Sequence, residues 1–453
     1  MGSDRFRWGV ATSAYQIEGA RRLEGKGDSI WDRFFDDGHM KVGGDVACDH
    51  YHRLDEDLDL IADLGVTSYR FSIAWSRVLP DGHGTVNQPG IDFYRRLVEG
   101  LLERNVEPWP TLYHWDLPQA LQEEGGWSSR ATVERFADYA ELMVSSLEGV
   151  TNWITHNEPW VAAFLGNLYG VFAPGLQDWS TALEVAHHLL LSHGRAVERI
   201  RENSTKANVG IALDCRPTRP PRLEAEEATR HFDGFRNRWF FDPVFGLGYP
   251  DDMMASYVER GRLEQMPSFI EDGDMERIAA PIDFLGLNYY TTVEVTRSED
   301  ERDDPERPPS QIPSEGYTEM GWRVDPDGLR SYLSELNNRY SPKSIVVTEN
   351  GASYSDSPDG YGHIEDQRRI DYLDQHIDAL LHAAEDGVPI DGYFVWSLLD
   401  NLEWTQGFEQ RFGLVWVDQE SQERTPKRSF EWFGSVVNPD SPESVALAIA
   451  RNG

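Results

Sequence analysis

Two glutamates, Glu158 and Glu349, are the residues of this chain best suited to chemistry. Each lies at the end of a short β-rich run, Glu158 in Thr-His-Asn-Glu-Pro-Trp and Glu349 in Val-Thr-Glu-Asn-Gly. Amide, imidazole and indole side chains end several similar runs. Two facing carboxyl groups among such donors suit cleavage of a glycosidic bond, because one carboxylic acid can protonate the leaving oxygen while the other, an anion, attacks the sugar or activates water.

The elements that must position these side chains recur along the chain as short apolar or β-rich runs. They cover residues 6–12, 67–73, 106–113, 152–156, 208–213, 284–288, 344–348 and 390–396. Amphipathic stretches typical of helices lie between them, as at residues 55–64 and 183–200. Eight strands alternating with helices favour a closed parallel barrel. An open doubly wound sheet would need a Gly-rich phosphate turn after the first strand, and the chain continues there as Ser-Ala-Tyr-Gln-Ile-Glu-Gly.

The fold class predicted is therefore α/β, a single (β/α)8 TIM barrel with extended βα loops. No linker divides the chain, so residues 1–453 are expected to form one domain, with residues 438–453 as an appended C-terminal tail. Charged, Pro-rich residues 298–316 and the segment 355–362 are expected to be long loops after the sixth and seventh strands. Long loops after strands fit a barrel whose βα loops build a site.

Working residues of such a barrel lie at the C-terminal ends of its strands. The side chains at or just beyond these ends are Gln16, Arg70, His114, Trp115, Asn157, Glu158, Asn288, Tyr290, Glu349, Trp396, Glu403 and Trp404. Glu158 and Glu349 follow from the fourth and seventh runs, which are nearly opposite in an eight-strand ring. Trp faces match the apolar faces of a pyranose, and the polar groups match its hydroxyls.

The chain resembles glycoside hydrolase family 1, the family of retaining β-glucosidases and β-galactosidases on a (β/α)8 barrel. The resemblance runs from about residue 5 to about residue 436. It rests on ten segments in order: WGVATSAYQIEGA (8–20), SIWDRF (29–34), CDHYHRL (48–54), YRFSIAWSRV (69–78), TLYHWDLPQAL (111–121), THNEPW (155–160), LGLNYYT (285–291), VTENG (347–351), YFVWSLLDNLEWTQGF (393–408) and RFGLVWVD (411–418).

The resemblance implies that Glu158 is the acid/base and Glu349 the nucleophile. The residues expected to support them are Arg70, Asn157, Tyr290 and Asn288. Arg70 and Tyr290 should keep Glu349 ionised, whereas a less polar surround and repulsion from Glu349 should keep Glu158 protonated. Asn157 resembles the residue that holds the sugar 2-hydroxyl. Retention of configuration implies carboxyl groups about 5–5.5 Å apart.

The same resemblance implies a substrate pocket. The side chains expected to bind substrate are Gln16, His114, Trp115, Trp322, Trp396, Glu403 and Trp404. Trp396 is expected to stack beneath the sugar, and Trp322 resembles the aglycone-side wall. Glu403 would accept from two neutral hydroxyls but repel a 6-phosphate, and residues 401–411 hold no Lys that could bind one. A 6-phospho-glycosidase is therefore disfavoured.

His156 departs from the family pattern, which has an apolar residue before Asn157. Its side chain should point away from Asn157 along a strand, so a packed, hydrogen-bonded histidine is the expected reading, with tuning of Glu158 as the alternative. The histidines at 50, 52, 187, 188 and 193 lack the spacing of a zinc helix. No metal and no cofactor are predicted.

The composition excludes other classes of protein. Asp and Glu number 78 against 42 Lys and Arg, for a formal charge of −36, so binding to nucleic acid or to anionic membranes is disfavoured. No apolar run reaches the ~18 residues of a membrane span. The N-terminus lacks a signal peptide and only two cysteines occur, so a cytoplasmic location is expected. Excess acidity with few Lys favours a high-salt interior, a halophile, over a codon effect.

The function predicted is an exo-acting retaining β-glycosidase: a β-glucosidase, with β-galactosidase or β-fucosidase activity as well. It would act on small neutral β-glycosides or oligosaccharides, and a homo-oligomer is compatible with the sequence. Two alternatives stay open. One is a predominantly transglycosylating enzyme, in which a sugar or alcohol intercepts the intermediate, and the other is a non-catalytic sugar-binding barrel.

Overall fold

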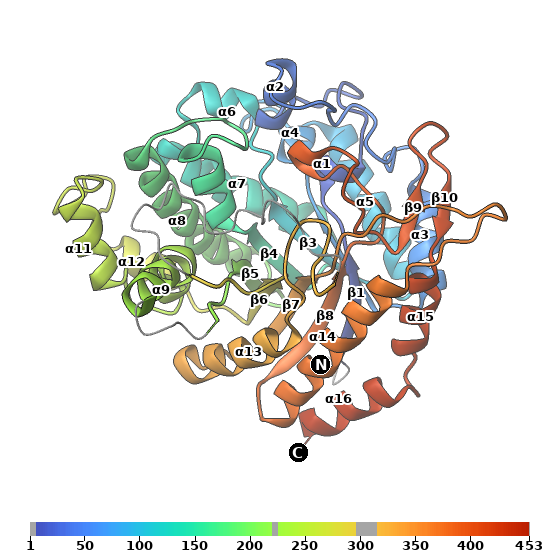
Figure 1. Ribbon diagram of the computed structural model, residues 1–453. Coiled ribbons are helices and arrows are strands. Elements are labelled where there is room, and N and C mark those ends of the chain that lie inside the picture. The colour runs from blue at the N-terminus through green and yellow to red at the C-terminus, as the bar shows by residue number, and fades with distance from the viewer. Residues whose placement is uncertain (1–5, 220–224, 296–314, 453) are drawn as a thin grey trace.

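Eight parallel strands close into a barrel at the centre of the molecule (Figure 1). The structure is a computed structural model and describes residues 6–219, 225–295 and 315–452. The strands are β1 (Arg7–Ala11), β2 (Ser68–Ser72), β3 (Glu107–Tyr113), β4 (Asn152–Asn157), β5 (Asn208–Cys215), β6 (Phe284–Tyr289), β7 (Ile345–Asn350) and β8 (Ile390–Trp396). They follow one another in chain order, and β8 pairs with β1. The predicted (β/α)8 barrel is confirmed.

Helices surround this barrel (Figure 1). They are α1 (Ala14–Ile17), α2 (Ile30–Asp36), α3 (Leu54–Leu64), α4 (Trp75–Val78), α5 (Gln88–Glu103), α6 (Gln119–Glu123), α7 (Arg130–Ser146), α8 (Trp179–Asn203), α9 (Glu226–Asp233), α10 (Trp239–Val244), α11 (Asp251–Glu259), α12 (Asp274–Ile278), α13 (Pro326–Tyr340), α14 (Gln367–Glu385), α15 (Arg428–Val436) and α16 (Pro442–Asn452). Short π-helical turns follow α9 and precede α8, and β9 (Val415–Val417) pairs antiparallel with β10 (Arg424–Pro426).

Aromatic and aliphatic side chains from alternate strand positions fill the barrel. The inner cluster takes one residue from each of several strands: Ala11, Trp109, Ile154, Ala212, Phe284, Val346 and Phe394. The Trp109 ring lies 5.0 Å from Phe284 and 5.3 Å from Phe394 between ring centroids. Gly9 leaves room for this layer, since a Cβ there would come within 2.4 Å of the Phe394 ring. The floor below the strand ends is therefore a packed core and not a pore.

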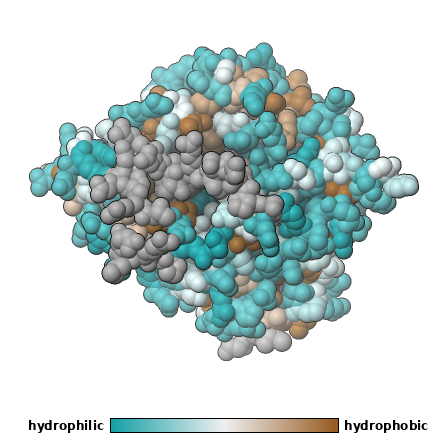
Figure 2. Space-filling view, viewed as in Figure 1, coloured by the Kyte–Doolittle hydropathy of each residue, from teal (hydrophilic) through white to brown (hydrophobic). Residues whose placement is uncertain are grey.

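The strands are nearly all buried on both faces, as expected where helices cover a parallel sheet. In β7 a β-branched run, Ile345 to Thr348, leads directly to Glu349, so the same strand supplies both core and site. The outer helices are amphipathic: along α3, Leu58, Ile61 and Leu64 are buried while Asp59 and Asp63 face solvent. Figure 2 shows a mainly hydrophilic face outside the grey residues.

The C-terminal segment, predicted only as an appended tail, forms helix α16 over residues 442–452. It packs beside α14 and α15 (Figure 1). Leu447 is fully buried, and the indole Nε1 of Trp8 in β1 donates to Ser444 Oγ at 2.9 Å. Residues 442–447 thus cover part of the barrel near β1.

The loop predicted at 298–316 lies outside the described residues except for its last two positions. The segment 355–362 is irregular, as predicted, and connects β7 to α14. No helix within the described ranges is long and apolar enough to cross a membrane.

Candidate active site

Glu349 lies in β7 against two hydrogen-bond donors. Arg70 Nη1, from β2, is 2.5 Å from Glu349 Oε1, and Tyr290 Oη, just beyond β6, donates to Oε2 at 2.6 Å. Burial raises the pKa of Glu349, and the charge of Arg70 together with these hydrogen bonds opposes the rise. Arg70 and the two hydrogen bonds thus favour the anion against the effect of burial, and they hold its two oxygens in fixed directions.

Arg70 connects this carboxylate to the neighbouring strands. Its side chain is 1% exposed, and its Nη2 donates to Asn157 Oδ1 at 2.6 Å. Nε donates to Thr111 Oγ1 at 3.2 Å, and Nη1 also reaches the Thr348 carbonyl at 3.2 Å. The guanidinium therefore links β2, β3, β4 and β7 in one plane of bonds, and a planar fork suits that task better than an ammonium.

Glu158 has a different environment. Its Oε1 accepts from Asn288 Nδ2 at 2.8 Å, and Asn288 also donates to Asn157 Oδ1 at 3.0 Å. Burial raises the pKa of Glu158 well above its ordinary value, the charge of Asp214 adds to the rise, and that of Glu349 adds further. Amide donation from Asn288 only partly offsets these effects. Glu158 is thus the carboxyl group that holds a proton, while Glu349 has a direct cation.

Glu158 also has a positive φ of 48°, a left-handed conformation that is costly for a residue with a side chain. Its backbone N–H donates to the Ala212 carbonyl of β5 at 2.9 Å, which helps to hold that turn. Trp115 and Trp404, two other predicted site residues, have φ of 78° and 48°. Such strain gathers at functional sites, where surrounding contacts fix the backbone.

Gln16 and Glu403 meet at the end of the site near β1 and β8. Gln16 Nε2 lies 3.3 Å from Glu403 Oε2 and 3.0 Å from Asn401 Oδ1, and Ser13 Oγ donates to Gln16 Oε1 at 2.6 Å. Burial raises the pKa of Glu403 to about 8; the charge of Glu349 adds to the rise, and the hydrogen bond from Gln16 opposes it.

His114 lies beside Asn157. Its Nε2 accepts from Asn157 Nδ2 at 3.0 Å, which leaves the proton on Nδ1. That buried Nδ1 has no hydrogen-bond partner in the described part of the chain. Burial, followed by the charge of Arg70, lowers the pKa of His114 well below its ordinary value, so the ring is neutral. A buried donor without a partner suits a hydroxyl of a bound molecule.

Aromatic rings form the walls around these polar groups. The His114 ring is nearly parallel to Trp396 and Trp404, with centroids 5.9 and 6.1 Å away. Trp115 lies 4.6 Å from Trp404 and donates its indole N–H to the Asn157 carbonyl at 2.9 Å. On the other side Trp322 is half-buried, 5.1 Å from the Tyr290 ring.

The structure therefore brings the predicted site residues together at the C-terminal ends of the strands. His156 points away from them: its Nε2 lies 2.8 Å from Ser192 Oγ and its ring packs 4.5 Å from Phe136. Burial lowers its pKa well below the ordinary value. No group of His, Cys, Asp or Glu within the described ranges is placed to hold a metal ion.

Three residues near the site were missed from the sequence. Asp214 is the last residue but one of β5, and Arg216 directly follows the strand, with its guanidinium carbon 5.1 Å from the Trp322 ring centroid. The strand-end rule would have found both, since they follow the fifth run. Asn401 has no such signal, because only the folded chain brings it to Gln16.

The sequence profile described as Glycosyl hydrolase family 1 matches residues 3–441. The chain belongs to this family. β-Glucosidase A of Acetivibrio thermocellus is 44% identical over 447 residues, covering 95% of this chain and 97% of the relative. A bifunctional β-D-glucosidase/β-D-fucosidase of Bifidobacterium breve is 43% identical, with 95% and 97% covered. The structure of a Thermotoga maritima β-glucosidase with castanospermine superposes with a TM-score of 0.89 at 42% identity, with 95% and 97% covered.

Membership of family 1 confirms the predicted class of enzyme. The chain is a glycoside hydrolase of the retaining, β-glucosidase type.

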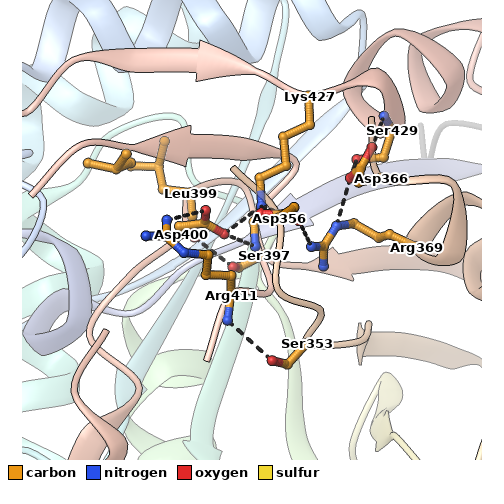
Figure 3. Close-up of polar contacts among 12 residues, drawn as sticks. Ser353, Asp356, Asp366, Arg369, Ser397, Leu399, Asp400, Arg411, Lys427 and Ser429 are labelled. Carbon is orange, nitrogen blue, oxygen red and sulfur yellow. Dashed lines mark hydrogen bonds and ion pairs between the residues drawn. The ribbon is translucent and has the colours of Figure 1, made fainter. Parts of the chain in front are cut away.

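A buried network of charges joins the segments that follow β7 and β8 (Figure 3). The Lys427 side chain is fully buried, and its Nζ lies 2.8 Å from Asp400 Oδ1 and 2.9 Å from Asp356 Oδ1. Arg369 Nη2 lies 2.5 Å from Asp356 Oδ2, and Arg411 Nη1 lies 3.2 Å from Asp400 Oδ2. Cations and carboxylates alternate, so each buried charge has a partner.

This network ties the loop after β7 to the segment after β8. Asp400 also accepts from the Gly413 N–H at 2.9 Å, and it directly precedes Asn401, the acceptor for Gln16. Ser353, two residues beyond Gly351 in the loop after β7, accepts from the Arg411 N–H at 3.2 Å (Figure 3). The position of Asn401 and Glu403 therefore depends on ionic contacts behind the pocket.

Lys427→Met is expected to lower the free energy of unfolding by about 3–5 kcal/mol, because two buried carboxylates lose their shared cation. Lys343→Met is the matched control: that side chain is 69% exposed and lies 3.8 Å from Asp283, so its loss should cost at most about 1 kcal/mol. Urea unfolding of both variants measures the difference. Equal stability of the two would contradict a structural role for Lys427.

Proposed function

We propose that this enzyme removes single sugars from the non-reducing end of β-glucosides by double displacement, with Glu349 as nucleophile and Glu158 as acid/base. The observation that carries the proposal is the unequal surroundings of the two carboxyl groups. Arg70 and Tyr290 both bind Glu349, whereas Glu158 has an amide donor and neighbouring anions. Such a division of a carboxyl pair assigns the acid and the nucleophile.

In the first step a Glu349 oxygen attacks the anomeric carbon. The bond from that carbon to the leaving oxygen breaks, and Glu158 gives its proton to the oxygen as it departs. Charge then leaves Glu349, which becomes an ester. The Asn157 Oδ1 accepts from Arg70 and Asn288 at 2.6 and 3.0 Å, and we assign the Asn157 amide to the sugar 2-hydroxyl.

In the second step Glu158, now a carboxylate, takes a proton from water. The water oxygen bonds to the anomeric carbon, and the ester bond breaks with its electron pair returning to Glu349. Two inversions at one carbon give net retention. No cofactor takes part in this sequence. The predicted separation of about 5–5.5 Å between the carboxyl groups belongs to this mechanism.

The sugar itself is proposed to lie between Gln16, His114, Glu403 and Trp404, over Trp396, with Trp115 behind and Trp322 on the leaving-group side. Glu403 and Gln16 supply acceptor and donor atoms for neighbouring hydroxyls, and His114 Nδ1 is a donor without a partner in the described chain. Glucose and galactose differ at one hydroxyl that these groups can serve in either orientation. Activity on glucosides, with galactosides and fucosides accepted as well, follows.

We also propose that the enzyme works in the high-salt cytoplasm of a halophile. The support is the formal charge of −36 and the placement of acidic side chains on exposed helix faces, such as Asp55, Glu56, Asp59 and Asp63 on α3. Repulsion among such groups weakens the folded state at low ionic strength, and salt screens it.

Glu349→Gly should abolish most turnover of 4-nitrophenyl β-glucoside, because no ester can form. Azide should restore release of nitrophenol by attacking the anomeric carbon from the vacated side, and the product should be the α-glucosyl azide. Product configuration is read by NMR. Near-normal turnover without azide, or a β-azide, would show that Glu349 is not the nucleophile.

Stability and activity should both rise or hold from dilute buffer to molar KCl, because screening relieves the repulsion of the acidic surface. Thermal midpoints and rates on a panel of nitrophenyl glycosides measure this, with sucrose of equal osmolality as the uncharged control. A maximum at low salt, with rapid loss in KCl, contradicts the halophile proposal and leaves the glycosidase mechanism untouched.

A further inference from the structure

Asp214 is a buried carboxylate near the proposed acid/base, Glu158. The two-step mechanism does not use Asp214. This residue is the Cα partner of Asn288 in the pairing of β5 with β6. Ala212 and Phe284 of the same two strands belong to the inner cluster of the barrel, and side chains two residues apart share a face. Asp214 and Asn288 therefore both point into the barrel, and Asn288 donates to Glu158 at 2.8 Å.

A buried arginine pairs with Asp214. Arg236, in the π-helical turn after α9, forms an ion pair with Asp214, and both side chains are at most 3% exposed. The Arg236 guanidinium carbon also lies 3.7 Å from the ring centroid of Trp160, two residues after Glu158. Asp214, Arg236 and the Glu158 turn are thus one packed cluster.

Other groups also face Glu158. Glu349 comes from β7, Asn288 from β6, and Arg216 from the position directly after β5. Arg70 and Tyr290 bind Glu349 directly. Among the charges, Asp214 raises the pKa of Glu158 more than Glu349 does, and Arg216 opposes both.

The two anions differ in one respect that matters chemically. Glu349 loses its charge when it becomes an ester, so its influence on Glu158 ends after the first step. Asp214 takes no part in bond making and keeps its charge in both steps. A carboxylate beside a permanent anion remains a stronger base, and stronger bases remove protons faster.

We propose that Asp214, fixed by Arg236, is a positioning residue for catalysis: a permanent anion that keeps Glu158 protonated before the first step and strongly basic in the second. This rests on the proposed roles of Glu158 and Glu349. It adds that two anions control the acid strength of Glu158. The charge of Glu349 is lost during each turnover, whereas the charge of Asp214 stays constant.

The test is the pH profile of kcat/KM for 4-nitrophenyl β-glucoside, whose basic limb reports ionisation of Glu158 in the free enzyme. In Asp214→Asn the basic limb should move down by about one pH unit, as expected for loss of a partly compensated charge at short range. In Arg236→Met it should move up, since Asp214 then acts without its cation. Asp214→Glu, which keeps the charge, should retain the wild-type limb.

A second readout follows the second step alone. With a dinitrophenyl β-glucoside the leaving group needs no proton, so kcat reports hydrolysis of the ester and its acidic limb reports Glu158 as base. That limb should also move down in Asp214→Asn, and the plateau should fall. Asp274→Asn is the matched control, since Asp274 is a fully buried carboxylate paired with Arg130 at 2.5 Å, and it should leave both limbs in place.

Asp214→Asn removes the buried ion pair with Arg236, which puts folding of this variant at risk. The double variant Asp214→Asn/Arg236→Met removes both charges and should still move the basic limb down, but by less than Asp214→Asn does. The reason is that loss of the cation partly opposes loss of the anion, and Asp214 acts on Glu158 more strongly than Arg236 does. Superimposable profiles for the wild type and this double variant would overturn the inference. That result is distinct from failure of the proposed function, which the azide product of Glu349→Gly decides.

Discussion

The contact between Arg70 and Glu349 is the interaction on which the rest of the site depends. A carboxylate at the bottom of a buried pocket is unfavourable without a cation, and Arg70 supplies one that is itself almost fully enclosed. The same guanidinium binds Asn157, which in turn binds His114 and, through Asn288, reaches Glu158. Four strands are held in register around one side chain, so the geometry of the pocket and the charge of its nucleophile have a common source.

Several buried carboxylates of this strongly acidic chain have a cation beside them. Arg70 serves Glu349, Arg236 serves Asp214, and Lys427 serves two carboxylates behind the pocket. None of these cations lies on the surface, where most of the acidic excess is found. Most of the acidic side chains that distinguish the composition therefore lie outside the buried interior.

The sequence predicted the barrel well because each strand is a short buried run with a distinct end. The strand ends predicted Glu158, Glu349, Gln16 and His114, because a polar residue after an apolar run can be recognised from the sequence alone. Asn157 and Glu349 turned out to lie within β4 and β7 rather than after them, because pairing with neighbours extends a strand beyond its apolar part.

What the sequence did not indicate depends on contacts between distant segments. Nothing in the sequence around Lys427 marks it as buried, yet folding places it between Asp356 and Asp400. The sequence predicts only a tail where α16 forms. Its contact with Trp8 joins opposite ends of the chain, so no local pattern indicates it. Asp214 follows the fifth run, but its ion pair with Arg236 forms because folding brings the turn after α9 to β5.

The raised pKa of Glu403, about 8, has a consequence for how the enzyme meets its sugar. At neutral pH the empty pocket holds this carboxyl group mainly in its protonated form. Hydroxyl donors of a bound sugar favour the anion, so binding is coupled to release of a proton to the solvent. The heat of binding would then vary with the ionisation enthalpy of the buffer, and affinity would increase with pH until the group is ionised before the sugar arrives.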